Sequence, residues 1–212
     1  MKPLRTLGKV ASKLAPGRAP YFIEAHLVKA LKIVDSEGPV GRVRLSKILG
    51  LGEGTVRTLV KHLKNEGLIK ISRTGVILTD SGKKLSSFLN SRISSETEVP
   101  QSSLTVGPFN IAVLVKNVAD AIKYGLEQRD AAIKVGASGA TTLIFSHGGL
   151  VMPGAEGEDV FKNIPAIRDV LISKLKPREG DVVIIGSGND RLTAELGAIA
   201  AALETLKSAG DP

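Results

Sequence analysis

The chain has 212 residues, of which 42% are hydrophobic and 24% charged, so it can bury a core and is long enough for two small domains. It has no cysteine and only three histidines, which excludes disulfides and thiolate metal sites and leads us to expect no metal and no cofactor. Its net charge of +8 is uneven: residues 1–94 carry 18 Lys and Arg against 6 Asp and Glu, whereas residues 95–212 carry 11 against 15.

Residues 1–20 contain five basic residues, three prolines and no acid, which predicts a flexible basic arm. A helical stripe of apolar residues then begins at Tyr21 and ends before a turn at residues 36–39. A short second helix is predicted around Leu45 to Leu49, where glycines stop it.

A third helix follows the tight turn at residues 50–52, because Val56, Leu59, Val60 and Leu63 recur at helical spacing. Two β-prone runs around a glycine turn come next and predict a hairpin, followed by one more helix. This order of elements is typical of a winged helix-turn-helix DNA-binding domain, which we place at residues 21–93.

The predicted third helix exposes a face without acids, and in this fold the third helix enters the major groove of DNA. Arg57 is the first candidate for a base contact, and Thr55 and Thr58 suit phosphates near the helix start. The candidate DNA-binding residues are Arg42, Arg44, Lys47, Thr55, Arg57, Thr58, Lys61, His62, Lys64 and Arg73. The alternatives are that the basic face is merely solvated and that His62 has no specific role.

Two stretches carry a resemblance to a known family. The run GLGEGTVRTLVKHLKNEGLI at residues 50–69, followed by ISRTGVILTDSGKKL at 71–85, resembles the winged-helix domains of prokaryotic transcriptional regulators. With RDAAIKVGASGATTLIF at 129–145 and GDVVIIGSGNDRLTAELGA at 180–198, the whole chain resembles predicted archaeal regulators that join such a domain to an uncharacterised C-terminal domain. The resemblance implies DNA binding and brings no effector with it.

Residues 94–108 are rich in Ser, Thr, Glu and Pro, which predicts a linker, and an α/β regulatory or dimerisation domain is predicted at residues 109–208. The patterns there give the order βαββαβα, which fits a ferredoxin-like sheet. The expected fold class is therefore α+β. The predicted strands are Phe109 to Val115, Thr141 to Phe145, Leu150 to Met152 and Val182 to Ile185, and the helices are Asn117 to Val135, Glu158 to Leu175 and Arg191 to Lys207.

One loop of this domain could bind a ligand through backbone N–H groups at a helix N-terminus. The candidate ligand-binding residues are Gly186, Ser187, Gly188, Asn189, Asp190 and Arg191. The sequence is not a dinucleotide fingerprint, because Arg191 stands where the third glycine belongs. In the alternative interpretation, Asn189 or Asp190 caps the last helix and the glycines only form the turn.

Together the patterns predict a sequence-specific transcriptional regulator that binds double-stranded DNA as a homodimer, with a small-molecule effector as a further possibility. No apolar run approaches the ~18 residues of a membrane span and no signal peptide is visible, so we expect a cytoplasmic protein without membrane contact. No catalytic constellation stands out. The rival hypotheses are an enzyme that acts on a phosphorylated or nucleotide ligand, and a winged helix that binds RNA or protein. The closing helix is one candidate dimer surface, although it could pack on its own sheet instead.

Overall fold

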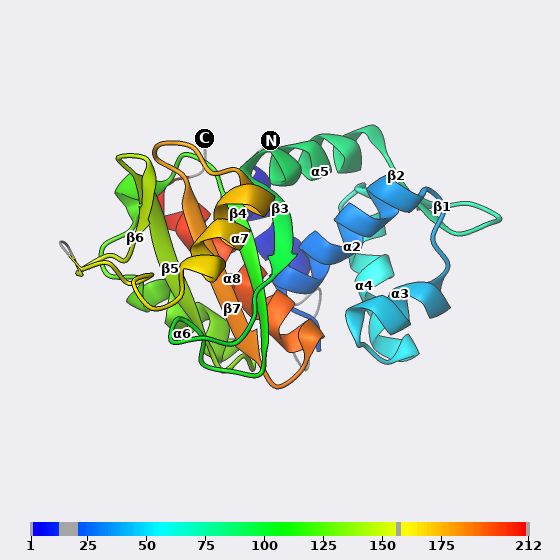
Figure 1. Ribbon diagram of the computed structural model, residues 1–212. Coiled ribbons are helices and arrows are strands. Elements are labelled where there is room, and N and C mark those ends of the chain that lie inside the picture. Colours follow the sequence, from blue (N-terminus) through cyan, green and yellow to red (C-terminus); the bar gives the residue numbers. More distant parts are fainter. Residues whose placement is uncertain (1, 13–20, 156–157, 211–212) are drawn as a thin grey trace. The chain divides into compact units, whose positions relative to one another are not determined.

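The computed structural model describes residues 2–12, 21–155 and 158–210, and Figure 1 shows its helices and strands. The chain forms two compact units that divide after Asn90. The first is mainly helical with a two-stranded sheet, and the second is built on a five-stranded sheet. The expected α+β class is confirmed.

The first unit contains the three helices, the hairpin and the following helix that the sequence predicts. Their inner faces are apolar, with Leu27, Leu31, Leu45, Leu49 and Leu59 fully buried. The left-handed backbone at Gly50 (φ +63°) ends the second of these helices and allows the tight turn into the third. The elements are α2 (Glu24–Glu37), α3 (Arg42–Leu49), α4 (Glu53–Asn65), β1 (Ile69–Ile71), β2 (Val76–Leu78) and α5 (Asp80–Arg92).

The prediction of a flexible arm at residues 1–20 is wrong for its first part, which forms helix α1 (Pro3–Ala11). Leu4, Leu7 and Val10 recur every three residues and are buried, and α1 packs on α2 and α4. Proline is well tolerated in the first turn of a helix, so Pro3 does not oppose it. The rest of the predicted arm, residues 13–20, lies outside the described residues.

The hairpin β1–β2 forms a wing that is tied to the start of α3. Val40, just before α3, exchanges two backbone hydrogen bonds with Val76 of β2, with N···O distances of 3.0 and 2.9 Å. In the wing turn, the Ser72 hydroxyl accepts a hydrogen bond from the N–H of Gly75 at 3.2 Å. Val40 therefore pairs with the end of β2 nearest the wing turn, as a short third strand would.

The segment predicted as a linker contains an edge strand, β3 (Ile93–Glu98), which starts directly after α5. It pairs antiparallel with β4 (Phe109–Val115), and Val99 and Leu104 beyond it are buried. An edge strand with one solvated face tolerates Ser, Thr and Glu, which explains why its composition resembles that of a linker.

The sheet of the second unit has the order β3-β4-β7-β5-β6, with all neighbours antiparallel. The predicted string βαββαβα is present from β4 onward, and β3 precedes it. Both helix-linked pairs, β4 with β5 and β6 with β7, are parallel strands split by one other strand, as in a ferredoxin-like sheet. The sheet departs from the expected ferredoxin-like arrangement in its order, because the second and fourth strands of this string, β5 and β7, are central where that fold has its first and third. The elements after β4 are η1 (Ala119–Ala121), α6 (Leu126–Lys134), β5 (Gly139–Ser146), β6 (Gly149–Val151), α7 (Pro165–Leu175), β7 (Val182–Gly188) and α8 (Arg191–Ser208).

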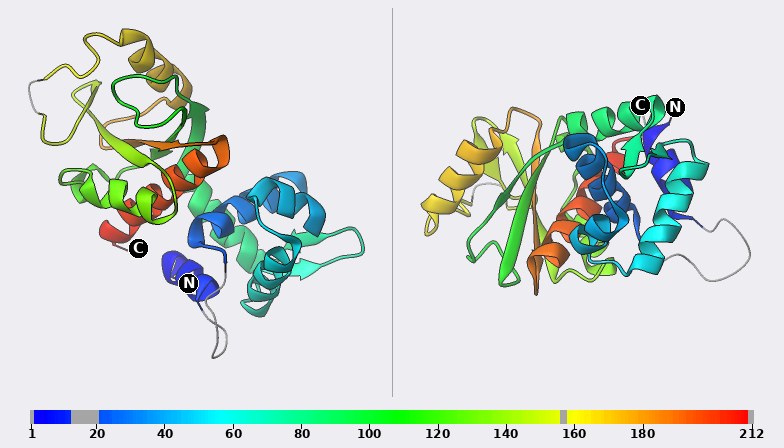
Figure 2. Two further views of the ribbon diagram at one scale, coloured as in Figure 1. Left: turned by 90° about the horizontal axis from the view of Figure 1, so that it is seen from below. Right: turned by 90° about the vertical axis from the view of Figure 1, so that its right-hand side faces the viewer.

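Helices cover both faces of this sheet. Helix α7 lies on one face, and α6 and α8 lie on the other (Figure 2, left). Successive residues of β7 alternate between the faces, so that Val183 and Ile185 join the core beneath α7. Of the five apolar residues that made α8 a candidate dimer surface, Leu192 is half-buried, and the buried ones are Leu196, Ile199, Leu203 and Leu206.

Helix α8 lies so close to β7 that two strand positions have no room for a side chain. A Cβ atom on Gly186 would stand 2.3 Å from the carbonyl oxygen of Ala194 and 2.4 Å from the backbone N of Ala198. A Cβ atom on Gly188 would stand 2.7 Å from the backbone N of Ala194. Glycine is therefore required here for helix packing.

We predict that Gly186→Ala destabilises the protein by about 1–3 kcal/mol, the usual cost of overpacking, because the obstructing atoms belong to the backbone of α8. Gly149→Ala is the matched control, since its new Cβ would meet only the Ser146 carbonyl oxygen at 4.0 Å. Denaturant unfolding of both variants tests this. Equal stability of the two variants would contradict the packing argument.

A second prediction concerns pH and His26, whose Nδ1 accepts a hydrogen bond from the N–H of Ile23 at the start of α2, at 3.2 Å. Burial, and secondarily the charge of Lys29, lower the pKa of His26 from 6.5 to about 4. The unfolded chain therefore binds the proton more tightly, and stability is lost as the pH falls from about 6.5 toward 4.

Glutamine at position 26 can still accept the helix-capping hydrogen bond but does not titrate. The unfolding free energy of His26→Gln should therefore fall less than that of the original protein between pH 6.5 and 4. If the unfolding free energies of the two proteins fell in parallel with pH, His26 would not contribute to the loss of stability at low pH.

Candidate nucleic-acid interface

Helix α4 presents one apolar face to the core and one polar face to solvent. Val56, Leu59 and Leu63 are at most 2% exposed. On the opposite side, Arg57 and Lys61 are four residues apart and both exposed, so they lie on the same face. The buried face fixes the orientation of the helix, and this determines which residues can reach a ligand.

Most of the predicted DNA-binding residues are accessible. Thr55 is half-buried and His62 is buried. The exposed ones are Arg42, Arg44, Lys47, Arg57, Thr58, Lys61, Lys64 and Arg73.

Some of these exposed groups already have internal partners. The Arg44 guanidinium makes two hydrogen bonds to the carboxylate of Glu37, at 2.5 and 2.6 Å, and these lower the pKa of Glu37. The Thr58 hydroxyl donates to the carbonyl oxygen of Gly54 at 3.2 Å. In the described part of the chain, no carboxylate forms an ion pair with Arg57 or Lys61. Their charges are thus available to an external partner.

The start of α4 differs from the expectation in one respect. The helix begins at Glu53, so an exposed carboxylate stands in its first turn, next to the face predicted to lack acids. Gly52 at the N-cap gives no side-chain hydrogen bond, which leaves N–H groups of the first turn available to an acceptor. A phosphate there would gain these donors and would be repelled by Glu53.

His62 is not part of the exposed face, so its prediction as a DNA contact is wrong. Its side chain is buried, and Nδ1 lies 2.8 Å from the carbonyl oxygen of Val10 in α1, to which it must donate. The ring also packs edge-on against Phe22, with centroids 5.3 Å apart. His62 therefore connects α4 to α1.

The wing adds one basic residue that the sequence interpretation missed. Lys70 lies in β1, is exposed, and stands opposite Ile77 in the strand register. Arg73 is exposed in the wing turn. The alternation of apolar and polar residues in Ile69, Lys70 and Ile71 was the available signal, although only Ile69 is buried and Ile71 is exposed like Lys70.

The loop predicted to bind a ligand is occupied by internal contacts. Gly186, Ser187 and Gly188 are buried residues of β7, and the Ser187 hydroxyl donates to Oδ1 of Asn110 at 2.6 Å. Asp190 caps α8 by accepting hydrogen bonds from the N–H and hydroxyl of Thr193, at 2.9 and 2.7 Å, and these lower the pKa of Asp190.

The remaining two residues of this loop are exposed, and Arg191 forms an ion pair with Glu98 at 2.7 Å. Helix packing, capping, a buried hydrogen bond and an ion pair already use five of these six residues, all but Asn189, which favours the alternative interpretation of the loop.

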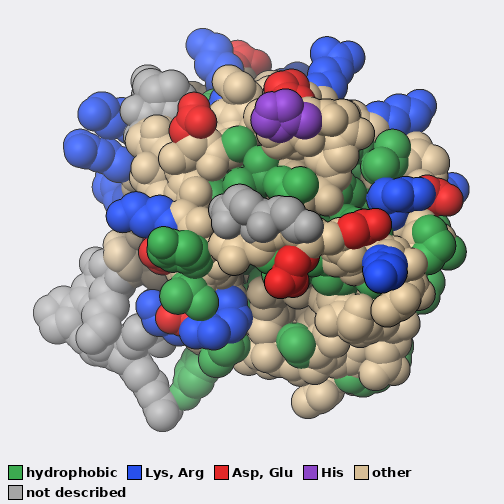
Figure 3. Space-filling model, turned by 60° about the vertical axis from the view of Figure 1, so that its left-hand side comes forward, with side chains coloured by type: hydrophobic (Ala, Val, Ile, Leu, Met, Phe, Trp, Pro, Cys, Tyr) green, Lys and Arg blue, Asp and Glu red, His purple; other side chains and the backbone are tan. Residues whose placement is uncertain are grey.

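Other kinds of site gain no support from the described residues. They contain no group of three His, Asp or Glu side chains that could hold a metal ion. None of their helices is both long enough and apolar enough to cross a membrane. On the face drawn in Figure 3, hydrophobic side chains are exposed in small separate groups between charged ones.

We predict that His62→Ala lowers stability and leaves the DNA affinity of the folded protein unchanged. The variant leaves the Val10 carbonyl without its donor, which costs about 1–3 kcal/mol. Lys64→Ala, an exposed change on the same helix, should alter stability by less than about 0.5 kcal/mol. Denaturant unfolding measures both. A stable His62→Ala variant that fails to bind DNA would restore a recognition role for His62.

Comparison with known proteins gives separate matches for the N-terminal and C-terminal parts of the chain. Residues 26–93 match the family described as the CggR N-terminal DNA binding domain, and residues 106–206 match a domain of unknown function, DUF4443. No curated protein matches the chain. Among solved structures, a hypothetical protein from Pyrococcus horikoshii OT3 is similar, with 28% identity and a TM-score of 0.66 over 87% of this chain and 97% of that one. The chain thus matches a DNA-binding family in its N-terminal part and DUF4443 in its C-terminal part, in agreement with the regulator family that its sequence resembles.

Proposed function

We propose that the protein is a sequence-specific transcriptional regulator that places α4 in the major groove of double-stranded DNA. The match of residues 26–93 to a DNA-binding family carries this proposal. The geometry of α4 supports it, because Arg57 and Lys61 extend from a helix whose other face is anchored in the core. An arginine in this position can donate two hydrogen bonds to the edge of a guanine, whereas a lysine suits a phosphate.

The residues around α4 are proposed to fix its register on the duplex. Arg42 and Lys47 lie in α3, Lys70 and Arg73 belong to the wing, and all four are exposed. Contacts from such residues to phosphates add affinity that depends on salt and carry little sequence information. Arg44 would have to exchange its contact with Glu37 for a phosphate.

The regulator is further proposed to act as a homodimer, with the second domain pairing the subunits, sensing a ligand, or doing both. One winged helix contacts only a few base pairs, and a two-fold pair reads half-sites about one helical turn apart. Selection from random duplexes tests this directly. A two-fold symmetric motif supports the dimer, and an asymmetric motif would contradict it.

We predict that Arg57→Ala weakens binding to the selected operator by about 1–3 kcal/mol and relaxes the preference at one base pair. Lys61→Ala should weaken binding to all DNA sequences alike and reduce the slope of log affinity against log salt concentration by about one. Fluorescence anisotropy at several salt concentrations, with selected and scrambled duplexes, distinguishes the two effects.

The matched control is Lys134→Ala, which removes an exposed lysine of α6 in the second domain. It should leave both affinity and salt slope unchanged. If Arg57→Ala and Lys61→Ala behave like this control, α4 does not dock into the groove. Tighter binding of single-stranded or structured RNA than of any duplex DNA would favour an RNA-binding winged helix instead.

A further inference from the structure

The second domain contains a cavity of about 620 Å³ at one end of its sheet, away from the loop discussed above. Its volume falls in the range of roughly 300–1,000 Å³ that small-molecule sites occupy. The walls come from β3, the end of β4, and the end of α7 with the loop that follows it. They comprise Ser94, Ser95, Leu114, Lys116, Asn117, Lys174, Leu175, Lys176, Arg178, Glu179 and Asp181, and this set is called the basic pocket below.

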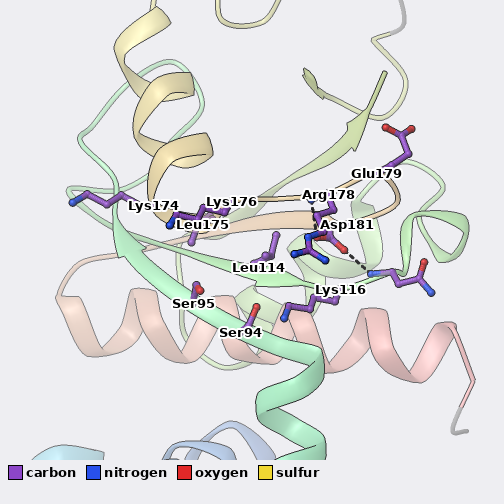
Figure 4. Close-up of a pocket in the computed structure, with 11 residues that line it drawn as sticks. Ser94, Ser95, Leu114, Lys116, Lys174, Leu175, Lys176, Arg178, Glu179 and Asp181 are labelled. Carbon is purple, nitrogen blue, oxygen red and sulfur yellow. Dashed lines mark hydrogen bonds between the residues drawn. The ribbon is translucent and has the colours of Figure 1, made fainter. Parts of the chain in front are cut away.

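Four side chains of the basic pocket are cationic and two are acidic, and both acids are already engaged. Asp181 accepts hydrogen bonds from the backbone N–H groups of Asn117 and Arg178, each at 2.9 Å. Glu179 accepts one from the N–H of His147 at 3.2 Å and extends away from the other labelled side chains in Figure 4.

The cations, by contrast, have no carboxylate partner. Within residues 2–12, 21–155 and 158–210, no ion pair involves Lys116, Lys174, Lys176 or Arg178. Like charges that share one cavity repel each other, and an anion between them relieves this repulsion. The excess of positive charge therefore favours an anionic occupant.

A polar atom without a partner also lies in the wall. The Ser94 hydroxyl oxygen is buried and has no hydrogen-bond partner in the structure. Buried hydroxyls are nearly always hydrogen-bonded, and one that is not calls for an explanation such as a missing ligand. This oxygen is closed to solvent even in the empty pocket, so a ligand oxygen can accept its hydrogen bond only after the Ser94 side chain rotates.

The backbone of the pocket is unusual in the same place. Ser95 (φ +30°), Asn117 (φ +53°) and Lys176 (φ +51°) have left-handed conformations, and only one other non-glycine residue in the described chain does. Ser95 is the extra residue of a bulge that interrupts the pairing of β3 with β4. Lys176 ends α7 as its left-handed cap, and asparagine tolerates this conformation, so Ser95 at the bulge is the unusual case. The three turns bring separate segments of the chain around one cavity.

We propose that the basic pocket binds a small anion with at least two negative charges, carried by phosphate or carboxylate groups. Lys116 and Arg178 provide charge-assisted hydrogen bonds, and the Ser94 hydroxyl, after rotation of its side chain, donates to the same ligand. The leucines Leu114 and Leu175 contact its uncharged part. This anion-binding proposal does not depend on whether the protein binds DNA.

A route from the basic pocket to the DNA-binding domain exists along the chain. Arg92, the last residue of α5, accepts a backbone hydrogen bond from the N–H of Lys116 at 2.9 Å. Ser94 and Ser95 follow two and three residues later. Anion binding that reorders the bulge would change the end of α5, so we assign the ligand the role of an effector. The effector role, unlike the anion binding itself, rests on the proposed function.

Isothermal titration calorimetry on the full chain, at constant ionic strength, tests the binding with pyrophosphate and citrate as probes. We expect saturable binding of at least one probe, and the preferred one shows whether phosphate or carboxylate is recognised. Lys116→Gln and Arg178→Gln should each weaken it at least tenfold. Lys134→Gln, which removes an exposed lysine outside the pocket, should leave it unchanged.

Absence of saturable binding for both probes would overturn the proposal, as would equal weakening by Lys134→Gln. Circular dichroism of each variant verifies that it is folded, which the exposure of Lys116 and Arg178 leads us to expect. If Lys116→Gln weakened duplex DNA binding as Lys61→Ala does, the cavity would be part of the DNA surface and not a small-molecule site.

The effector role has its own test, which is operator affinity with and without the bound probe. An unchanged affinity overturns the effector role while the basic pocket stands. Failure of the protein to bind any duplex DNA overturns the proposed function, and calorimetry still decides the pocket. The two failures are thus distinguishable.

Discussion

The attachment of helix α1 to the N-terminal domain depends on the hydrogen bond between His62 and the carbonyl of Val10. A helix of nine residues is too short to be stable alone, and the last carbonyl groups of any helix lack internal partners. His62 provides one of these carbonyls with a donor, and Lys9 adds an ion pair to Glu66 at 2.8 Å. Helix α1 is thereby fixed to the inner side of α4. The outer, basic side of α4 keeps its orientation because Val56, Leu59 and Leu63 are buried on the inner side, and the contact with α1 adds stability to this arrangement.

Sequence periodicity predicted α2, α3 and α4 because each must bury one stripe of apolar residues. Helix α1 has the same kind of stripe, formed by Leu4, Leu7 and Val10. The basic residues and prolines around this stripe are typical of a flexible segment and outweighed it in the prediction. His62 was misplaced for a related reason. It lies at the edge of the apolar stripe of α4, where spacing alone does not separate a buried histidine from an exposed one. Only the position of α1 decides this, and it is a tertiary contact.

In the second domain, the order of strands and helices could be predicted, whereas the position of each strand in the sheet could not. Strand β7 has fully buried residues on both faces, which agrees with its central place but does not name its neighbours. Gly186 and Gly188 were interpreted as allowing a ligand to approach the backbone. They do allow a close approach, and the approaching group is α8.

The basic pocket shows the same limit of sequence reasoning. Lys174, Lys176 and Arg178 are near one another in the chain, but Ser94 and Lys116 are far from them in sequence. The pairing of β3 with β4 and the hydrogen bonds to Asp181 bring the segments together. A cavity assembled from three segments leaves no local motif, so its cations looked like ordinary surface residues.

The backbone pairing of Val40 with Val76 has a consequence for how DNA shape is recognised. Because the wing is hydrogen-bonded to the residues just before α3, it cannot swing independently of the helices. With α4 in the major groove, the distance from α4 to the wing is then constant. A duplex whose groove width does not match this distance loses one of the two sets of contacts. The domain would therefore distinguish sequences by the width and stiffness of their grooves at base pairs that it never touches.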